Sequence, residues 1–196
     1  MIQFSYLPNE LTVHYHKGTN FIIGANSPSL PIYFALKNKH EYQMLGTEQF
    51  ISDIMIIVEQ FAMKFDLVVI PESRYGFLKE ITKNMSNVLE LKKRAKNEIC
   101  ELAQKTQSWK KQDRESAKRS WNEMGESFTI NHIKSNKRKD YIPYLFENTT
   151  VQNNTKILLL DDFIMSGNTI KAMAMALGNI QYAIFGIFHQ NDYQCN

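Results

Sequence analysis

The sequence predicts an α/β fold: a mostly parallel sheet flanked by helices, with a long helical insertion and a small N-terminal β hood. Two observations favour the parallel sheet. Short, mainly apolar runs at residues 67–70, 156–160 and 182–188 lack polar alternation, as strands buried on both faces do. A polar loop and then a helical pattern follow each of the first two runs, which is the order of a strand–helix–strand unit.

Length and composition favour a single domain over residues 1–196. With 43% hydrophobic residues, a chain of 196 residues can bury one substantial core. Its apolar runs fall far short of the ~20 residues of a membrane span, and the N-terminus does not resemble a secretion signal. Cys100 and Cys195 have neither disulfide-framework nor metal spacing. We therefore expect a cytoplasmic protein with reduced thiols.

Residues 1–32, the N-terminal hood, are expected to form strands, because apolar residues alternate from 11 to 15. His14 and His16 would share one face of such a strand. Without a third ligand nearby, two half-exposed histidines are a simpler interpretation than a metal site. Apolar residues at three- and four-residue intervals from 50 to 62 then predict a helix.

A helical insertion is expected over residues 78–130. The stretch from 78 to 124 has no proline and many good helix formers, which favours one or two long helices with a break near 104–109. Residues 134–154 are polar, basic and asparagine-rich, and predict a loop around the apolar YIPYLF. A further helix is expected at 170–177.

Basic residues are concentrated in one part of the chain. The formal net charge is only +3, but residues 92–119 hold ten Lys and Arg against four Asp and Glu. A solvated helix face is the commoner explanation, and a surface for phosphates or nucleic acid is the alternative. Trp109, Trp121 and Phe128 lie among these charges and could stack on bases, although aromatic residues at helical spacing more often belong to a core.

The segment ILLLDDFIMSGNT, residues 157–169, carries the most specific chemical pattern in the sequence. Two adjacent acids repel each other unless a cation or hydroxyl donors compensate them. A vicinal diol and Mg²⁺ would do so, because carboxylates accept hydrogen bonds from hydroxyls and Mg²⁺ prefers oxygen ligands. The small and hydroxyl residues that follow open a helix, whose free amides favour a phosphate. A helix cap at Asp162 with a turn at Gly167 would leave the second acid unexplained.

This segment resembles the phosphoribosyl-pyrophosphate signature of type I phosphoribosyltransferases: an apolar strand, two acids, three variable residues and Thr/Ser-Gly-x-Thr. The resemblance implies that Asp161 and Asp162 hold the ribose hydroxyls, directly or near magnesium, and are catalytic and metal-binding residues. The residues implied to hold the 5′-phosphate are Met165, Ser166, Gly167, Asn168 and Thr169. Met165 departs from the usual small hydroxyl residue and removes one phosphate donor.

The same family binds pyrophosphate in a short loop after an earlier strand, and VVIPESRYGF occupies that place. The implied binding residues are Glu72, Ser73, Arg74, Tyr75 and Gly76. Arg74 is also an implied catalytic residue, because a guanidinium donates to phosphate oxygens in a fork. Glu72 is unusual beside a pyrophosphate: it would bind magnesium, pair with Arg74 or point away.

More of the chain resembles one branch of the family, the ComF-like proteins. YFALKNKHEYQMLG (33–46) is similar to their Leu-Lys segment and RYGF to their Arg-Gly-Phe. Residues 106–128 resemble their Gln-then-Arg-then-Phe spacing. The four-cysteine zinc module found at the front of many ComF proteins is absent from this sequence.

The resemblance implies a magnesium-dependent phosphoribosyltransferase that uses 5-phosphoribosyl 1-diphosphate (PRPP) or a related ribose diphosphate and releases pyrophosphate. Basic segments at 105–119 and 134–139 are candidate lids over the phosphates. One alternative is a non-catalytic PRPP-, nucleotide- or nucleic-acid-binding module on the same fold, and another is an assembly protein that uses its helical insertion. The sequence selects neither an acceptor nor an oligomeric state.

Overall fold

The computed structural model describes residues 11–16, 19–24, 47–73, 76–106, 109–164, 166–178 and 181–189. Its elements are β1 (Leu11–His16), β2 (Thr19–Gly24), α2 (Thr47–Ala62), β3 (Leu67–Pro71), α3 (Phe77–Thr82), β4 (Val88–Leu91), α4 (Lys96–Thr106), α5 (Lys111–Glu123), the 3-10 helices η1 (Ile130–His132), η2 (Ser135–Asp140) and η3 (Ile142–Tyr144), β5 (Ile157–Ile164), α6 (Asn168–Ala176) and β6 (Tyr182–His189).

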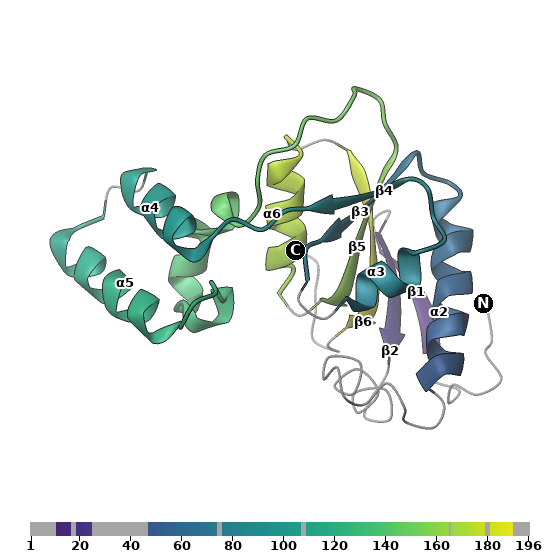
Figure 1. Cartoon of the computed structure of the whole chain (residues 1–196), viewed down its shortest axis with the longest axis horizontal. Helices are drawn as coiled ribbons and strands as arrows, with labels where there is room; N and C mark the ends of the chain where they lie inside the picture. The colour runs from purple at the N-terminus through teal and green to yellow at the C-terminus, as the bar shows by residue number, and fades with distance from the viewer. Residues whose placement is uncertain are drawn as a thin grey trace.

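The described strands form one sheet in the order β1-β2-β6-β5-β3-β4. Neighbouring strands are parallel except for β1 and β2, which form an antiparallel hairpin. This arrangement confirms the predicted α/β fold with a mostly parallel sheet flanked by helices (Figure 1). The hairpin extends the sheet beside β6, and its role as a hood over a ligand stays a prediction.

Helices cover both faces of the sheet. Alternate residues of β3 and β5 enter two separate hydrophobic clusters: Val68 and Leu158 pack in the cluster of α2 and α3, whereas Val69 and Leu159 pack in the cluster of α6. Because side chains alternate along a strand and both faces are buried, each strand needs apolar residues at successive positions. This explains why the sequence signal of these strands is a continuous apolar run.

The predicted helical insertion is wrong at its start. Residues 78–91 contain the end of α3 and then β4, which pairs in parallel with β3. A short apolar segment such as VLEL fits a strand and a helix equally well, so periodicity alone does not distinguish them. The break near 104–109 is confirmed, since α4 ends at Thr106 and α5 begins at Lys111.

Residues 92–147 form a helical lobe that projects beside the sheet and contains α4, α5 and η1 to η3 (Figure 1). The chain enters and leaves it side by side: Arg94 N donates to Leu145 O at 3.0 Å, and Glu147 N donates to Lys92 O at 2.9 Å. The segment predicted as a loop at 134–154 therefore includes the 3-10 helices η2 and η3 and the residues that leave the lobe beside its entrance.

Four aromatic residues form the core of the helical lobe. The Tyr141 ring lies 5.7 Å from Trp109, 6.5 Å from Trp121 and 5.5 Å from Phe128, measured between centroids. Trp109 Nε1 donates to Asp140 Oδ2 at 3.1 Å, and Trp121 Nε1 donates to the Tyr141 hydroxyl at 3.0 Å. Trp109 and Phe128 are buried. The core interpretation of these rings is thus correct, and their use for base stacking is not supported.

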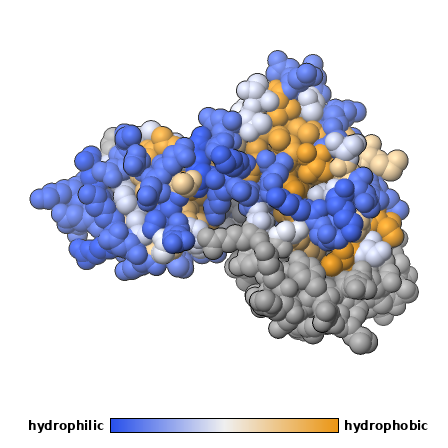
Figure 2. Space-filling view, in the orientation of Figure 1, coloured by the Kyte–Doolittle hydropathy of each residue, from blue (hydrophilic) through white to orange (hydrophobic). Residues whose placement is uncertain are grey.

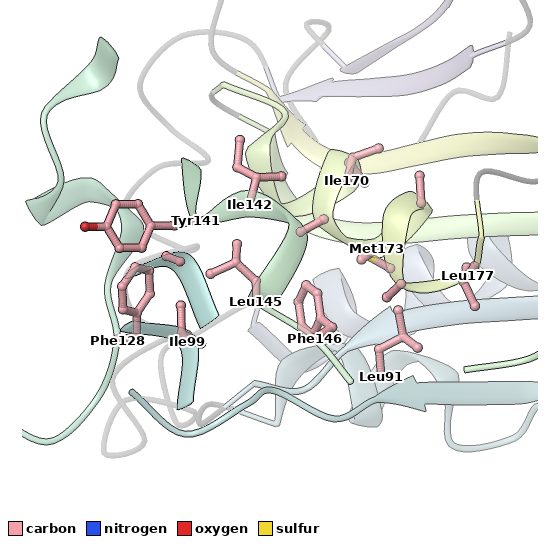
Figure 3. Packing of buried hydrophobic residues seen from close by; sticks show 14 of the residues in the cluster. Leu91, Ile99, Phe128, Tyr141, Ile142, Leu145, Phe146, Ile170, Met173 and Leu177 are labelled. Carbon is pink, nitrogen blue, oxygen red and sulfur yellow. The ribbon is translucent and has the colours of Figure 1, made fainter. Parts of the chain in front are cut away.

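The lobe and the sheet share one hydrophobic cluster. Figure 3 shows side chains that continue from Tyr141 and Phe128 through Leu145 and Phe146 to Met173 of α6. Burial of this cluster removes a large apolar area from water, which is the main favourable term in folding. Within the described ranges, no helix is both long and apolar enough to cross a bilayer.

Two titratable groups in this cluster predict a loss of stability at alkaline pH. Burial raises the pKa of the Cys100 thiol to about 11 and that of Tyr141 to about 12. Between the unfolded and folded pKa values the unfolded state releases protons that the native state keeps, so stability falls as pH rises. We expect the urea midpoint to fall steadily from about pH 9 to pH 11.

The matched variant for this measurement is Cys100→Ala, which should flatten part of the decline. Because the Cys100 side chain is buried, with 5% of its surface exposed, the variant also tests whether the thiol is needed for packing. A midpoint that is constant from pH 8 to pH 11 would contradict the burial of both groups.

Candidate functional site

The site lies where the chain reverses its direction of winding through the sheet. β3 continues through α3 to β4 on one side, whereas β5 continues through α6 to β6 on the other, and β3 pairs directly with β5. In open parallel sheets, ligands bind outside the carboxyl ends of the strands at such a switch point. The loops after β3 and β5 are the two loops singled out from the sequence.

A glycine in the left-handed region precedes the helix after each loop. Gly76 (φ 68°) is the N-cap of α3 and Gly167 (φ 66°) is the N-cap of α6. A residue without Cβ adopts this conformation at little cost. A left-handed glycine therefore turns the chain from strand to helix in both loops. Both loops lie at the carboxyl ends of the parallel strands.

A cleft of about 350 Å³ joins the two loops. Its volume is within the range of small-molecule sites. Five residues predicted from the sequence line it, although nearly 90 positions separate the two groups: Glu72, Ser73, Asp161, Asp162 and Thr169. The other lining residues are Pro71, Leu78, Lys93, Phe128, Thr129, Ile130, Asn131, Leu145 and Phe146.

The two acids lie within a strand that continues past the predicted run at 156–160. β5 extends to Ile164, and Asp161 is opposite Gly186 of β6. Asp161 is only 4% exposed, and its Oδ1 accepts a hydrogen bond from the Asp162 amide at 3.0 Å. Both residues line the cleft, and strand pairing fixes the backbone position of Asp161.

Gly186 allows the strand to continue past the acids. A Cβ at this position would lie 2.5 Å from Ile164 Cδ1 and 2.9 Å from its Cγ1. The Ile164 side chain is buried and occupies that space. The missing side chain at Gly186, which pairs with Asp161, therefore leaves room for the Ile164 side chain of β5.

The carboxylates of the cleft suit magnesium when a substrate supplies further oxygen ligands. Among the residues that the structure describes, no group of three or more His, Cys, Asp and Glu side chains could hold a metal ion. Asp161 and Asp162 offer carboxylate oxygens, which are ligands that Mg²⁺ prefers, and Mg²⁺ is commonly bound by one or two carboxylates plus substrate phosphates and waters. The residues present therefore fit a substrate-bound ion.

Glu72 has a structural role that the sequence did not reveal. Its Oε2 accepts the Lys93 amide at 2.7 Å, and its own amide donates to Leu91 O at 2.9 Å. Glu72 thus ties the loop after β3 to the end of β4. This contact was not among the three alternatives considered from the sequence; Arg74 lies outside the described residues, and magnesium binding by Glu72 stays a prediction.

We expect Glu72→Ala to lower the free energy of unfolding by about 0.5–1.5 kcal/mol, because a hydrogen bond to a carboxylate is lost at an exposed site. Glu72→Gln keeps an acceptor oxygen and should cost less. Urea unfolding measures both values, and hydrogen exchange at the Lys93 amide should accelerate in Glu72→Ala. Unchanged exchange in that variant would contradict the tie.

The remaining predicted site residues either do not line the cleft or fall outside the residues that the structure describes. Gly76, Ser166, Gly167 and Asn168 are described but are not among its lining residues. Arg74, Tyr75 and Met165 fall outside the described residues. All ligand-binding roles of the site residues therefore stay predictions.

Sequence reasoning missed the contribution of the helical lobe. Lys93 and residues 128–131 line the cleft, and a second hollow of about 530 Å³ shares Lys93, Phe128 and Thr129 with it. Had VLEL been recognised as a strand, Lys93 would have been expected at the same sheet edge as the acids. The candidate lids at 105–119 and 134–139 line neither hollow.

The basic run at 92–96 mainly holds the lobe together. Lys93 Nζ donates to Phe128 O at 2.9 Å, and Arg94 Nη1 donates to Phe146 O at 2.9 Å. Lys96 Nζ donates to the carbonyl groups of residues 121 and 125. These cations connect the lobe entrance to segments up to 52 residues away in the sequence.

Comparisons with known proteins give a likeness among solved structures but none among sequences. No family model matches the sequence, and no curated protein matches it. Among solved structures, the chain is similar to a Helicobacter pylori xanthine-guanine-hypoxanthine phosphoribosyltransferase at 14% identity, over 78% of this chain and 80% of that chain, with a TM-score of 0.38. At this level, the likeness assigns neither a ligand nor an activity to this chain.

Proposed function

We propose that this chain binds PRPP, or a related ribose diphosphate, with Mg²⁺ and transfers its phosphoribosyl group to an acceptor. One observation carries the proposal: the acids and Thr169 of the diol-and-phosphate motif share a cleft with Glu72 and Ser73 of the pyrophosphate-like loop. The cleft lies at the switch point of the sheet, where ligand binding is expected on general grounds.

In the proposed reaction, a lone pair of the acceptor forms a bond to the anomeric carbon of ribose. The bond from that carbon to the diphosphate oxygen breaks, its electron pair leaves with pyrophosphate, and the acceptor releases a proton. Bound Mg²⁺ would neutralise charge on the diphosphate. The protein then has two tasks, which are to orient the sugar and to stabilise the leaving group.

Asp161 and Asp162 are proposed to orient the sugar by accepting hydrogen bonds from its 2′- and 3′-hydroxyls. Charged acceptors make stronger hydrogen bonds than neutral ones. The Thr169 hydroxyl is proposed to donate to the 5′-phosphate, and Ser73 and Arg74 to the diphosphate. Holding the sugar in this way favours reaction by fixing the anomeric carbon relative to the acceptor.

Calorimetric titration of the purified chain with PRPP, with and without MgCl₂, tests the binding. Pyrophosphate release is then measured with purine and pyrimidine bases, nicotinamide and small amines as acceptors. Magnesium-dependent binding together with acceptor-dependent release is the expected result. Absence of PRPP binding would contradict the proposal.

Binding without turnover on any acceptor would favour the alternative, a non-catalytic PRPP- or nucleotide-binding module. Among the described residues, Lys93 is the single cation that lines the cleft, and its ammonium donates to Phe128 O. The ComF-like branch and a cytoplasmic location are also retained as proposals, on the sequence features given above.

A further inference from the structure

We propose that the helical lobe binds the phosphate backbone of nucleic acid through one face of α5 and the adjoining η2. Residues 92–147 contain fourteen Lys and Arg against eight Asp and Glu, whereas the rest of the chain contains nine against twelve. The positive charge of this protein is therefore concentrated in the lobe. Figure 2 shows a predominantly hydrophilic surface over it.

The structure separates the cations that stabilise the lobe from those available to a partner. The first set is engaged with carbonyl groups, as described for residues 92–96, or with acids at the surface: Lys92 pairs with Glu147, Lys105 with Glu101, and Lys137 with Asp113. Seven other cations are exposed and have no carboxylate partner within the described part of the chain. This basic surface consists of Lys110, Lys111, Arg114, Lys118, Arg119, Lys134 and Lys139.

The spacing of the basic surface suits a polymer of phosphates. Lys110, Arg114 and Lys118 recur every four residues, so they lie along one side of α5 about 6 Å apart. The adjoining side of α5 carries Asp113, which pairs with Lys137 of η2, and Ala117, which packs against the lobe core. Because Arg114 and Lys118 are exposed beside this packed side, a long anion can meet several cations at once, although Glu115 also lies on this helix.

The burial of apolar side chains favours nucleic acid over a lipid surface and indicates how it would be contacted. The large apolar residues that are exposed in the described chain, such as Ile56 and Met175, all lie outside the lobe, so the basic surface has nothing to insert into a lipid bilayer. Trp109 and Phe128 are buried in the lobe core. The contacts should therefore be to phosphates rather than to bases, with little dependence on sequence.

Fluorescence anisotropy with a mixed-sequence 30-nucleotide single-stranded DNA, titrated at several NaCl concentrations, tests the proposal. We expect affinity to fall steeply with salt. The variant Lys111→Gln/Arg114→Gln/Lys118→Gln should bind at least about tenfold more weakly at low salt, and the slope of log K against log [NaCl] should shrink by about 2, since each phosphate contact contributes about 0.7. None of the three residues lines the cleft, so PRPP binding should be unchanged.

The matched control is Lys83→Gln/Lys156→Gln/Lys171→Gln, which removes the same charge from exposed sites outside the lobe. It should keep most of the affinity and the slope. Equal losses in both triple variants would overturn the proposal, since net charge alone would then explain binding. Failure of the wild type to bind DNA, tighter binding to polyglutamate, or tighter binding to phosphatidylserine vesicles would also overturn it.

Discussion

The double variant Asp161→Asn/Asp162→Asn is expected to bind PRPP with Mg²⁺ at least about 100-fold more weakly than the wild type. Each carboxylate is proposed to accept a hydrogen bond from a ribose hydroxyl, and a hydrogen bond to a charged group contributes about 1.5–3 kcal/mol. Two such losses correspond to roughly two orders of magnitude or more in affinity. Calorimetric titration at fixed MgCl₂ measures the change, and any pyrophosphate release should fall in parallel.

The substitution is chosen to preserve the fold. Asn keeps an oxygen at each position, so the hydrogen bond from the Asp162 amide to the side chain at 161 is retained. Asp66→Asn/Glu80→Gln is the matched control because it removes two carboxylates outside the cleft. It should bind PRPP like the wild type. Wild-type affinity in the Asp161/Asp162 variant would refute the role of these acids.

The second large effect is expected at Tyr141. Tyr141→Ala should lower the free energy of unfolding by roughly 3–5 kcal/mol, as large-to-small changes of buried aromatic residues do. The side chain is 1% exposed, contacts three aromatic rings and accepts the Trp121 indole N–H. The change leaves a cavity and a partly buried donor without its acceptor.

Urea unfolding measures this loss, and Tyr141→Phe is the control. Phenylalanine keeps the ring and removes only the hydroxyl, so it should cost about 0.5–1.5 kcal/mol. Because Phe128 packs on Tyr141 and also lines the cleft, Tyr141→Ala should weaken ligand binding more than Tyr141→Phe does. Equal stability of the two variants would show that the ring is not a core element.

Strong, uniform patterns account for the parts of the fold that the sequence predicts well. Buried parallel strands leave continuous apolar runs, and the predicted runs at 67–70 and 182–188 coincide with β3 and β6. The predicted helices at 50–62 and 170–177 coincide with α2 and α6. The meeting of the two loops could be anticipated because the carboxyl ends of parallel strands lie at one edge.

The parts that escaped prediction depend on contacts between distant residues. β4 has only four residues and no distinctive period. The Glu72 carboxylate binds an amide 21 positions away, and the Lys93 ammonium binds a carbonyl 35 positions away. Composition showed that residues 92–96 are basic, but only the folded lobe shows that their charge is used to bind backbone carbonyls.

The pairing of β5 with β6 at Asp161 has a thermodynamic consequence. Ordering the backbone of a flexible residue costs about 1–2 kcal/mol in conformational entropy, and folding has already met this cost at Asp161, which β6 holds opposite Gly186. A ligand that enters the cleft therefore meets an acid whose backbone is already ordered. Binding at this position should show a smaller entropic penalty than binding to a loop that orders around its ligand.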